Sequence, residues 1–418
     1  MAHNETEPLP DTRKPRLLLV AATTGYQTRS LAEAAARQNI EVILATDRCH
    51  ILEDPWRDNA IPVRFEEPAA LTDVKVDGIV AVADRPTLIA ALTAAAVGLP
   101  WHSREAVRAC RNKHRMREIL ADAGLPVPAH FQIPYNADPA DAAAIATYPC
   151  VLKPLGLSAS RGVIRANDPE QFIAAFERIR RILDKPEIRH LHEEWNDLIQ
   201  IEQYIEGREF ALEGLVTQGE LQVLAIFDKP DPLEGPFFEE TIYVTPSRES
   251  AETQQAIVAA TKQAITALGL SHGPIHAEMR VNARGVNILE IAARPIGGLC
   301  ARALRFQNDL TLEDLVVLHA IGRPFPDPVL ARPAMGVMMI PVPRAGIFQS
   351  ARLPANSAAD EIIITAKQGQ KLIPLPEGAS YPGFIFASGP DAATVELSLR
   401  SAHDGIEFEI LTALDVVS

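Results

Sequence analysis

The stretch from residue 273 to 298, GPIHAEMRVNARGVNILEIAARPIGG, constrains the fold most because it predicts a β-hairpin with a defined register. Apolar and polar residues alternate along both of its halves, as expected for two half-buried strands. A three-residue turn with Gly285 in the left-handed conformation would pair Met279 with Leu289 on the buried face. The hairpin therefore predicts which side chains face the core and which face outwards.

The same register places Glu278 opposite Glu290. Two carboxylates facing each other across a ladder repel, since their Cβ atoms are only about 5 Å apart, and a bound cation would remove the repulsion. Hard oxygen ligands suit Mg²⁺. Arg294 follows, and then Gly297 and Gly298, which would let a phosphate or a substrate approach the backbone closely. We expect a Mg²⁺ platform beneath the phosphates of a nucleotide; the alternative is a solvent-facing hairpin with two unrelated glutamates.

The bulk properties of the chain limit the classes of protein to consider. Its 418 residues are enough for about two or three domains. A net charge of −14 and a pI near 5.3 argue against a nucleic-acid partner or an anionic membrane surface. The sequence has no apolar run of the roughly 20 residues that a transmembrane helix needs, and residues 1–14 have the composition of a disordered leader. Four cysteines without CxxC spacing suit a reduced, cytoplasmic protein and predict neither a zinc site nor disulfides.

Residues 15–108 show the alternation of strands and helices that is typical of a doubly wound α/β domain. The first loop contains only one glycine, Gly25, so the GxGxxG fingerprint of dinucleotide sites is absent. Asp84 and Arg85 fall at the carboxyl end of a predicted strand, where open α/β sheets place ligand contacts. A helix-capping aspartate beside a surface arginine is the equally simple alternative.

Residues 148–166, YPCVLKPLGLSASRGVIRA, predict a strand that delivers Lys153, a loop of small residues, and a returning strand. Such a hairpin can fold its backbone N–H groups over phosphates while the lysine supplies a point charge. It is not a Walker A loop, because the lysine precedes the loop, and a plain glycine-containing hairpin is the alternative. Lys113, at the start of a predicted helix, means little by itself.

Residues 198–216 predict two strands joined at a bend that Glu202 and Glu209 flank. A third strand then ends in a long polar loop, residues 229–247, and a loop of that length is usually functional. Its candidates for a lid or a substrate contact are Lys229, Glu239, Glu240 and Thr241. From residue 331 to 418, strands and one amphipathic helix predict a small α+β domain with no catalytic constellation of its own.

With these segments in order, the chain resembles the ATP-grasp superfamily of carboxylate–amine ligases along almost its whole length. The resemblance rests on NKHRMREILADAGLPVP, on VLKP with its small-residue loop, on IEQYIEG-REF, and on the hairpin with its two glutamates and arginine. It implies a multidomain α/β and α+β fold. A Rossmann-like pre-ATP-grasp domain would span 15–108, and the ATP-grasp domain 109–330, with a phosphate-covering subdomain at about 125–203. A C-terminal α+β domain would span 331–418.

The resemblance also implies roles for individual residues. ATP phosphates would be contacted by Lys113 and Lys153, with the loop residues Ser158 and Ser160. The adenine would be received by Glu202, Gln203, Tyr204 and Ile205, and the ribose by Glu209. Mg²⁺, with Mn²⁺ as an alternative, would be held by Glu278 and Glu290. Catalysis would rest on Lys153 and on Arg294, which would stabilise the acyl phosphate and the tetrahedral adduct. The substrate residues would be Asp84, Arg85, Glu240, Arg294, Gly297 and Gly298.

One departure from the family pattern narrows the expected activity. Many members carry an asparagine as a further metal ligand two residues after the second glutamate, where this chain has Ala292. The form EIAARPIGG is similar to the L-amino-acid ligase and carnosine-synthase-like branch. The resemblance thus implies amide formation from small carboxylate and amine substrates, one of them an amino acid, in a homodimer. A purine-biosynthetic ligase, a biotin-carboxylase-like enzyme and an inactive nucleotide-binding regulator are the alternatives.

Overall fold

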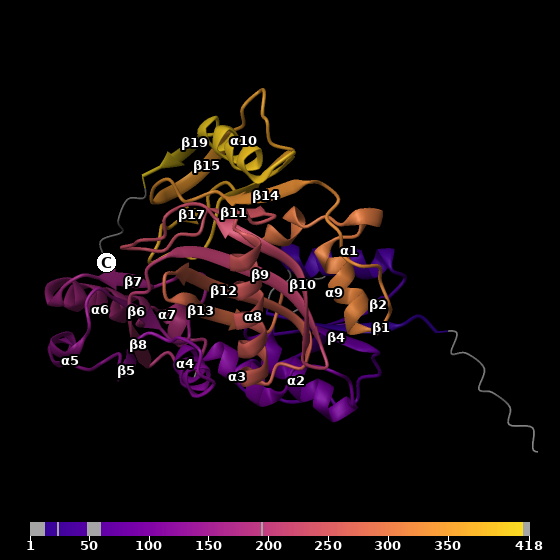
Figure 1. Cartoon of the computed structure of the whole chain (residues 1–418), viewed down its shortest axis with the longest axis horizontal. Coiled ribbons are helices and arrows are strands. Elements are labelled where there is room, and N and C mark those ends of the chain that lie inside the picture. Colours follow the sequence, from indigo (N-terminus) through magenta and orange to yellow (C-terminus); the bar gives the residue numbers. More distant parts are fainter. Residues whose placement is uncertain (1–12, 23–24, 48–59, 194, 413–418) are drawn as a thin grey trace, which may run out of the picture.

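The computed structural model describes residues 13–22, 25–47, 60–193 and 195–412, so most of the predicted leader lies outside the described residues. Figure 1 shows a central sheet with a small antiparallel unit at the lower left, the N-terminal α/β unit at the lower right and the last helix of the chain above that sheet. Among the described residues, no helix is long and apolar enough to cross a membrane. The α/β and α+β fold class predicted from the sequence is confirmed.

The N-terminal unit is a parallel sheet of order β3-β2-β1-β4, covered by helices. Its strands are β1 (Arg16–Ala21), β2 (Glu41–Thr46), β3 (Ala60–Pro62) and β4 (Gly78–Val82). Its helices are α1 (Tyr26–Arg37), α2 (Pro86–Val97) and α3 (Arg104–Arg111). Consecutive residues 17–21 of β1 are fully buried, as expected for a parallel strand covered on both faces. Asp84 and Arg85 follow β4 at its carboxyl end, as predicted.

The small antiparallel unit, which we call the covering subdomain, follows α4 (Lys113–Asp122). Its four-stranded sheet has the order β5-β8-β6-β7. The strands are β5 (His130–Pro134), β6 (Cys150–Pro154), β7 (Ile164–Ala166) and β8 (Leu198–Gln203). The helices are α5 (Pro139–Ile145), α6 (Pro169–Leu183) and α7 (Pro186–Arg189). Phe172 and Phe176 of α6 are fully buried in its core, so this unit has an apolar centre of its own.

The central sheet has eight strands in the order β13-β12-β9-β10-β11-β14-β18-β16. The strands up to the hairpin are β9 (Arg208–Thr217), β10 (Glu220–Lys229), β11 (Ile242–Thr245), β12 (His272–Asn282) and β13 (Gly285–Ala292). Helix α8 (Ala251–Leu268) connects β11 to β12. The other three strands are β14 (Ala334–Met339), β16 (Glu361–Ile364) and β18 (Gly383–Gly389). These three C-terminal strands therefore extend the central sheet.

The remaining C-terminal elements cover this sheet and its neighbours. They are η2 (Cys300–Ala303), η3 (Gln307–Asp309), α9 (Leu312–Ala320), β15 (Gly346–Arg352), β17 (Lys371–Leu372), α10 (Ala392–Asp404) and β19 (Glu407–Leu411). Helix α9 packs on α1 of the N-terminal unit, where Arg37 and Asp314 form an ion pair at 2.8 Å. The boundary at residue 331 stays a prediction, since β14 beyond it is hydrogen-bonded to β11 before it.

The predicted hairpin forms, with one correction to its register. Glu278 lies opposite Glu290 as predicted, but Met279 pairs with Ile288 and not with Leu289. The turn contains two residues instead of three, so the ladder accommodates the extra residue as an irregularity beside Glu278. Ile288 consequently faces the core, whereas Leu289 lines a pocket.

Candidate functional site

Most of the predicted nucleotide and metal residues line one pocket between the covering subdomain and the central sheet, which we call the central pocket. Those residues are Lys113, Lys153, Ser158, Ser160, Glu202, Gln203, Tyr204, Ile205, Glu209, Glu240, Glu278 and Glu290. They come from α4, from β6 and the loop after it, from β8 and the segment after it, and from β9, β12, β13 and the loop before β11. Residues separated by more than 170 positions in the sequence are thus brought to one place.

Lys153 is held at the pocket by a buried ion network. Its ammonium lies 2.5 Å from Glu202, and Arg117 donates to the same carboxylate at 2.9 and 3.3 Å. Burial opposes the charge of Glu202, but the two cations outweigh it and hold the pKa of Glu202 well below its usual value. Burial also lowers the pKa of Lys153. The Glu202 carboxylate therefore positions Lys153, the residue predicted to contact phosphate. The role of Glu202 in binding adenine stays a prediction.

Arg117 is a site residue that the sequence reasoning missed. Its side chain is 1% exposed and also donates to the carbonyl oxygens of Ile288 and Leu289 at 3.0 and 2.9 Å. It therefore connects the covering subdomain to the hairpin strand that carries Glu290. The only sequence signal for it is an arginine in the helix that begins at Lys113, among other charged residues of the same helix.

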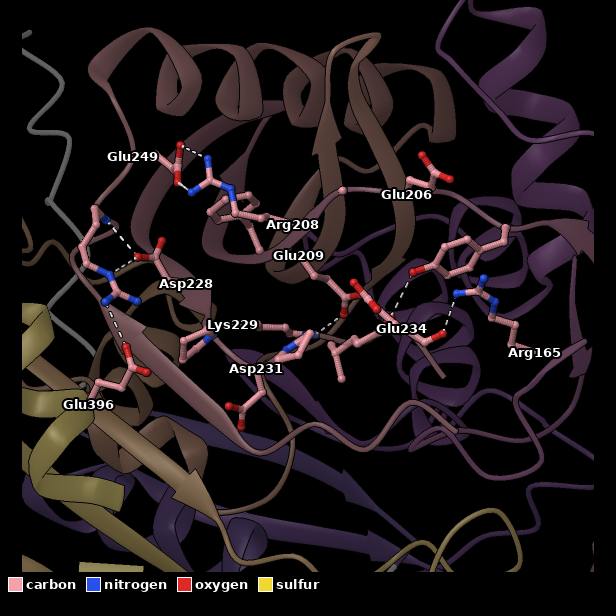
Figure 2. Close-up of a pocket in the computed structure, with 17 residues that line it drawn as sticks. Arg165, Glu206, Arg208, Glu209, Asp228, Lys229, Asp231, Glu234, Glu249 and Glu396 are labelled. Atoms are coloured by element: carbon pink, nitrogen blue, oxygen red, sulfur yellow. Dashed lines mark hydrogen bonds and ion pairs between the residues drawn. The ribbon is translucent and has the colours of Figure 1, made fainter. Parts of the chain in front are cut away.

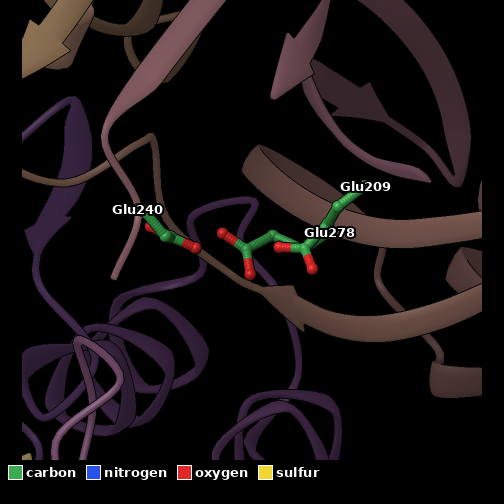
Figure 3. Close-up of side chains that lie close together, drawn as sticks. All are labelled: Glu209, Glu240 and Glu278. Atoms are coloured by element: carbon green, nitrogen blue, oxygen red, sulfur yellow. The ribbon is translucent and has the colours of Figure 1, made fainter. Parts of the chain in front are cut away.

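Three carboxylates surround one lysine deep in the pocket. Glu209, Glu240 and Glu278 each offer an oxygen within 4.8 Å of the others, and Figure 3 shows these side chains converging. The ammonium of Lys229 lies 2.9, 2.6 and 3.1 Å from them respectively. Burial opposes its charge, but the three carboxylates outweigh burial and hold the pKa of Lys229 well above its usual value. From the sequence, Lys229 was predicted only as a candidate for a lid or a substrate contact in the loop 229–247.

His276 supports Glu278 from the opposite side. One ring nitrogen contacts the carboxylate of Glu213, and the other lies 3.1 Å from Glu278. Burial opposes protonation, but Glu213 and Glu278 raise the pKa of His276 to about 9. The second oxygen of Glu213 accepts the backbone N–H of Ile296 at 3.1 Å. These contacts through Glu213 and His276 fix the orientation of Glu278. The only sequence signal for the role of His276 is that positions 276 and 278 share a strand face.

The donor set fits a hard divalent cation. Glu278 and Glu290 face each other on the ladder and line the same pocket, as predicted, and Glu240 adds a third carboxylate beside Glu278. Carboxylate oxygens are the ligands that Mg²⁺ prefers. The ammonium of Lys229 already supplies one positive charge among Glu209, Glu240 and Glu278.

A second pocket, which we call the adjoining pocket, has a volume of about 270 Å³ and lies beside the N-terminal unit. Asp84 and Arg85 line it, and the guanidinium of Arg294 donates to Asp84 at 2.9 and 3.3 Å. Burial opposes the charge of Asp84, but Arg294 holds its pKa below the usual value. Arg294 itself, like Gly297 and Gly298, is absent from the residues that line either pocket. The structure thus brings Asp84 and Arg294 together and leaves the two glycines apart.

The two pockets share one boundary. Lys113, Leu157, Ser158 and Glu290 line both of them. The ammonium of Lys113 donates to the carbonyl oxygen of Leu157 at 3.1 Å, which links the start of α4 to the small-residue loop. A group in the central pocket and a group in the adjoining pocket would therefore meet at this lysine and at Glu290.

A third, larger pocket of about 930 Å³ continues the central pocket past Glu209 (Figure 2). Several of its charged side chains are paired with each other. Arg208 donates to Glu249 at 2.7 Å, and Arg248 lies 3.1 Å from Asp228 and 2.9 Å from Glu396. Because these charges are mutually satisfied, we regard this space as the outer mouth of the central pocket.

Comparison with known proteins agrees with this architecture. Residues 146–303 match the family model described as an ATP-grasp domain. The chain is 28% identical to an alanine–anticapsin ligase of Bacillus subtilis over 48% of its length and 44% of the relative's. It is 28% identical to a dapdiamide A synthase of Enterobacter agglomerans over 45% of its length and 43% of the relative's. The match thus spans a little under half the length of these curated relatives.

The likeness to solved structures extends over nearly the whole chain. The crystal structure of an L-amino acid ligase from Bacillus licheniformis superposes with a TM-score of 0.79 and 25% sequence identity, covering 96% of this chain and 100% of that one. Residues 146–303 therefore match the ATP-grasp domain, and the chain has an ATP-grasp fold similar to that of an L-amino acid ligase.

Proposed function

We propose that this protein is an ATP-dependent, ADP-forming ligase that joins the carboxylate of an amino acid to an amine. The observation that carries the proposal is the shared boundary of the two pockets at Lys113 and Glu290. A nucleotide in the central pocket would place its terminal phosphate where a carboxylate in the adjoining pocket could reach it. The names of the similar ligases support the same reaction class.

The proposed reaction has two steps. A substrate carboxylate oxygen attacks the γ-phosphorus, the bond to the β-phosphate oxygen breaks, and ADP leaves. The amine nitrogen then attacks the carbonyl carbon of the acyl phosphate, loses a proton, and expels phosphate. Neither step needs a nucleophilic side chain. Positioning and charge stabilisation therefore have to supply the rate enhancement.

In this proposal the chain's own residues supply those two contributions. Lys153 and Lys113 would neutralise phosphate charge, and Glu202 with Arg117 would keep Lys153 in its position. Arg294, which donates to Asp84, would stabilise the tetrahedral oxyanion. Glu278 and Glu290 would hold Mg²⁺, which when bound neutralises charge on the transferred phosphoryl group.

The adjoining pocket is where the amino acid substrate would bind in this proposal. The names of the similar ligases favour an amino acid over a ribonucleotide, and hence a peptide or amide ligase over a purine-biosynthetic enzyme.

The test is a matrix of single amino acids and amino-acid pairs, assayed for ADP formation and followed by mass analysis of the product. Parallel reactions contain bicarbonate, or formate with glycinamide ribonucleotide. We expect a pair of amino acids to stimulate ADP formation and to give a condensation product. Stimulation only by bicarbonate or by the ribonucleotide would contradict the proposal.

A pair of variants tests the site itself. Glu290→Gln should reduce turnover at least about a hundredfold, because it removes one charge from the cation-binding donor set. Glu220→Gln, at the exposed start of β10, is the matched control and should leave turnover unchanged. Equal turnover in the two variants would leave the proposed site without support.

A further inference from the structure

One wall of the adjoining pocket comes from a short segment of the covering subdomain. This segment, which we call the wall segment, comprises residues 188–193 and Trp195. Ile188, Leu191, Glu193 and Trp195 all line the pocket. Ile188 is 2% exposed and Trp195 is 8% exposed, whereas Leu191 is only half-buried. Among the apolar side chains of this segment, Leu191 is therefore the one with accessible surface that a substrate in the pocket could contact.

Ion pairs fix the wall segment to the N-terminal half of the chain. One oxygen of Glu193 lies 2.5 Å from Arg85, and the other lies 2.9 Å from Arg111 of α3. Arg85 also donates to the carbonyl oxygen of Leu191 at 3.2 Å. The side chain of Glu193 is only 10% exposed, so solvent screens these pairs little. Arg85, predicted as a substrate contact, is thus engaged in holding the wall.

Trp195 provides a second anchor on the same helix. The guanidinium groups of Arg108 and Arg111 lie 5.6 and 5.5 Å from the centre of its ring. Cations at this distance from an indole face are attracted to it. The wall segment is therefore held at two points, on either side of residue 194, and cannot retreat without breaking contacts at both.

A second part of the pocket lining is fixed as well. Leu157 and Arg161 of the small-residue loop belong to it. That loop is tied to the C-terminal part of the chain, since Arg161 donates to the carbonyl oxygen of Glu377 at 3.0 Å and Gly162 donates to the carbonyl oxygen of Pro376 at 3.0 Å. With both segments anchored, a larger substrate cannot be accommodated by simple displacement of either one.

We propose that the wall segment determines specificity: it restricts the proposed amino acid substrate to a compact apolar side chain, with Leu191 as the limiting contact and Glu193 as a positioning residue. This inference rests on the proposed function. The apolar residues Pro86, Leu155 and Leu157 line the same pocket as Leu191, and the charges of Arg85 and Arg111 there are engaged by Glu193. An aliphatic or small aromatic side chain matches such a lining, and a charged one would lose its hydration there.

The test uses an aliphatic series of L-amino acids from alanine to norleucine, with phenylalanine, against a fixed amine partner. One methylene in a hydrophobic pocket changes kcat/KM by roughly 10- to 200-fold. Leu191→Ala should therefore raise the ratio of kcat/KM for norleucine over alanine at least about tenfold. Leu353→Ala, at an exposed leucine far from the pocket lining, is the matched control and should leave the ratio unchanged.

Glu193→Gln tests the positioning role. Loosening the wall should raise KM for the amino acid and flatten the preference along the series, while KM for ATP stays within about twofold. A mere loss of folded protein would lower kcat for every substrate and leave the preference intact. An unchanged preference in both Leu191→Ala and Glu193→Gln would overturn the inference while the proposed function stands.

A binding readout separates the inference from the proposed reaction. Tryptophan emission should change when norvaline is added to the wild-type protein with ADP, and Trp195→Phe should abolish that change while Trp101→Phe retains it. If no amino acid pair supports turnover, the proposed function fails, and this titration still decides whether an apolar amino acid meets the wall. No Trp195-dependent change would overturn the inference.

Discussion

Replacement of Arg117 by methionine tests whether the buried ion network holds the site together. Arg117 makes four hydrogen bonds, two to the Glu202 carboxylate and two to the carbonyl oxygens of Ile288 and Leu289. Methionine fills much of the same space but donates no hydrogen bond. The two carbonyls would lose their donors, and Glu202 would keep only Lys153 as a cation.

The magnitude follows from those lost contacts. An unsatisfied buried acceptor costs about 1–3 kcal/mol. Removal of one partner from a buried ion pair costs about 3–5 kcal/mol. Because Lys153 still compensates Glu202, we expect about 3–5 kcal/mol in total and not the sum of all losses. For a cooperative unit of roughly 150–250 residues this corresponds to a fall in Tm of roughly 6–20 °C.

The control lies two positions earlier on the same helix. Arg115 has a side chain that is 57% exposed and pairs with Glu118 at 2.9 Å, so Arg115→Met should cost at most about 1 kcal/mol. Thermal denaturation of both variants, followed by circular dichroism, gives the comparison. Initial rates against ATP concentration give a second one, since only Arg117→Met should raise KM for ATP through Lys153. A similar loss of stability in the two variants would refute the reasoning.

Three further predictions test other parts of the structure. Burial lowers the pKa of His319 to about 4, so the unfolded chain takes up a proton at this histidine before the folded protein does. The free energy of unfolding should therefore fall by roughly 3 kcal/mol as the pH falls from 6.5 to 4. His319→Gln should flatten that part of a curve of Tm against pH. Glu377→Gln should speed tryptic cleavage after Arg161, because it removes the ion pair with Arg178 that fixes residue 377, whose backbone oxygen accepts from Arg161. Gly298→Val should lower Tm, since Gly298 has φ +64° and an added Cβ would lie 3.1 Å from Phe384; an unchanged Tm would contradict the strain argument.

Local patterns were sufficient to predict the strands, because alternation with period two specifies which residues of a hairpin share a face. The pairing of Glu278 with Glu290 was predicted correctly from a turn that is one residue too long, because the irregularity in the ladder compensates for the shorter turn. The same reasoning gave the wrong partner for Met279, because a two-residue turn with an irregular ladder and a three-residue turn produce the same pairing further along the hairpin. The difference depends on turn geometry that residue types alone do not specify.

The contacts that position the site could not be predicted because they join distant segments. Nothing in the sequence distinguishes Arg117, which pairs with a residue 85 positions away, from exposed Arg115 on the same helix. Glu193 likewise lies in a run of charged and histidine residues that gives no sign of its partners Arg85 and Arg111. Burial decides which of these charges matters, and burial depends on the tertiary fold.

The covering subdomain contributes a carboxylate to an ion network at each of the two pockets. At the central pocket Glu202 accepts from Arg117, and at the adjoining pocket Glu193 accepts from Arg85 and Arg111. In both networks the arginines lie outside the covering subdomain and the carboxylates lie within it. A movement that lifts this subdomain from the nucleotide side must therefore also strain the substrate side. The two pockets are coupled by the rigidity of one small sheet, and this coupling suits a reaction in which both substrates must be enclosed before an acyl phosphate forms.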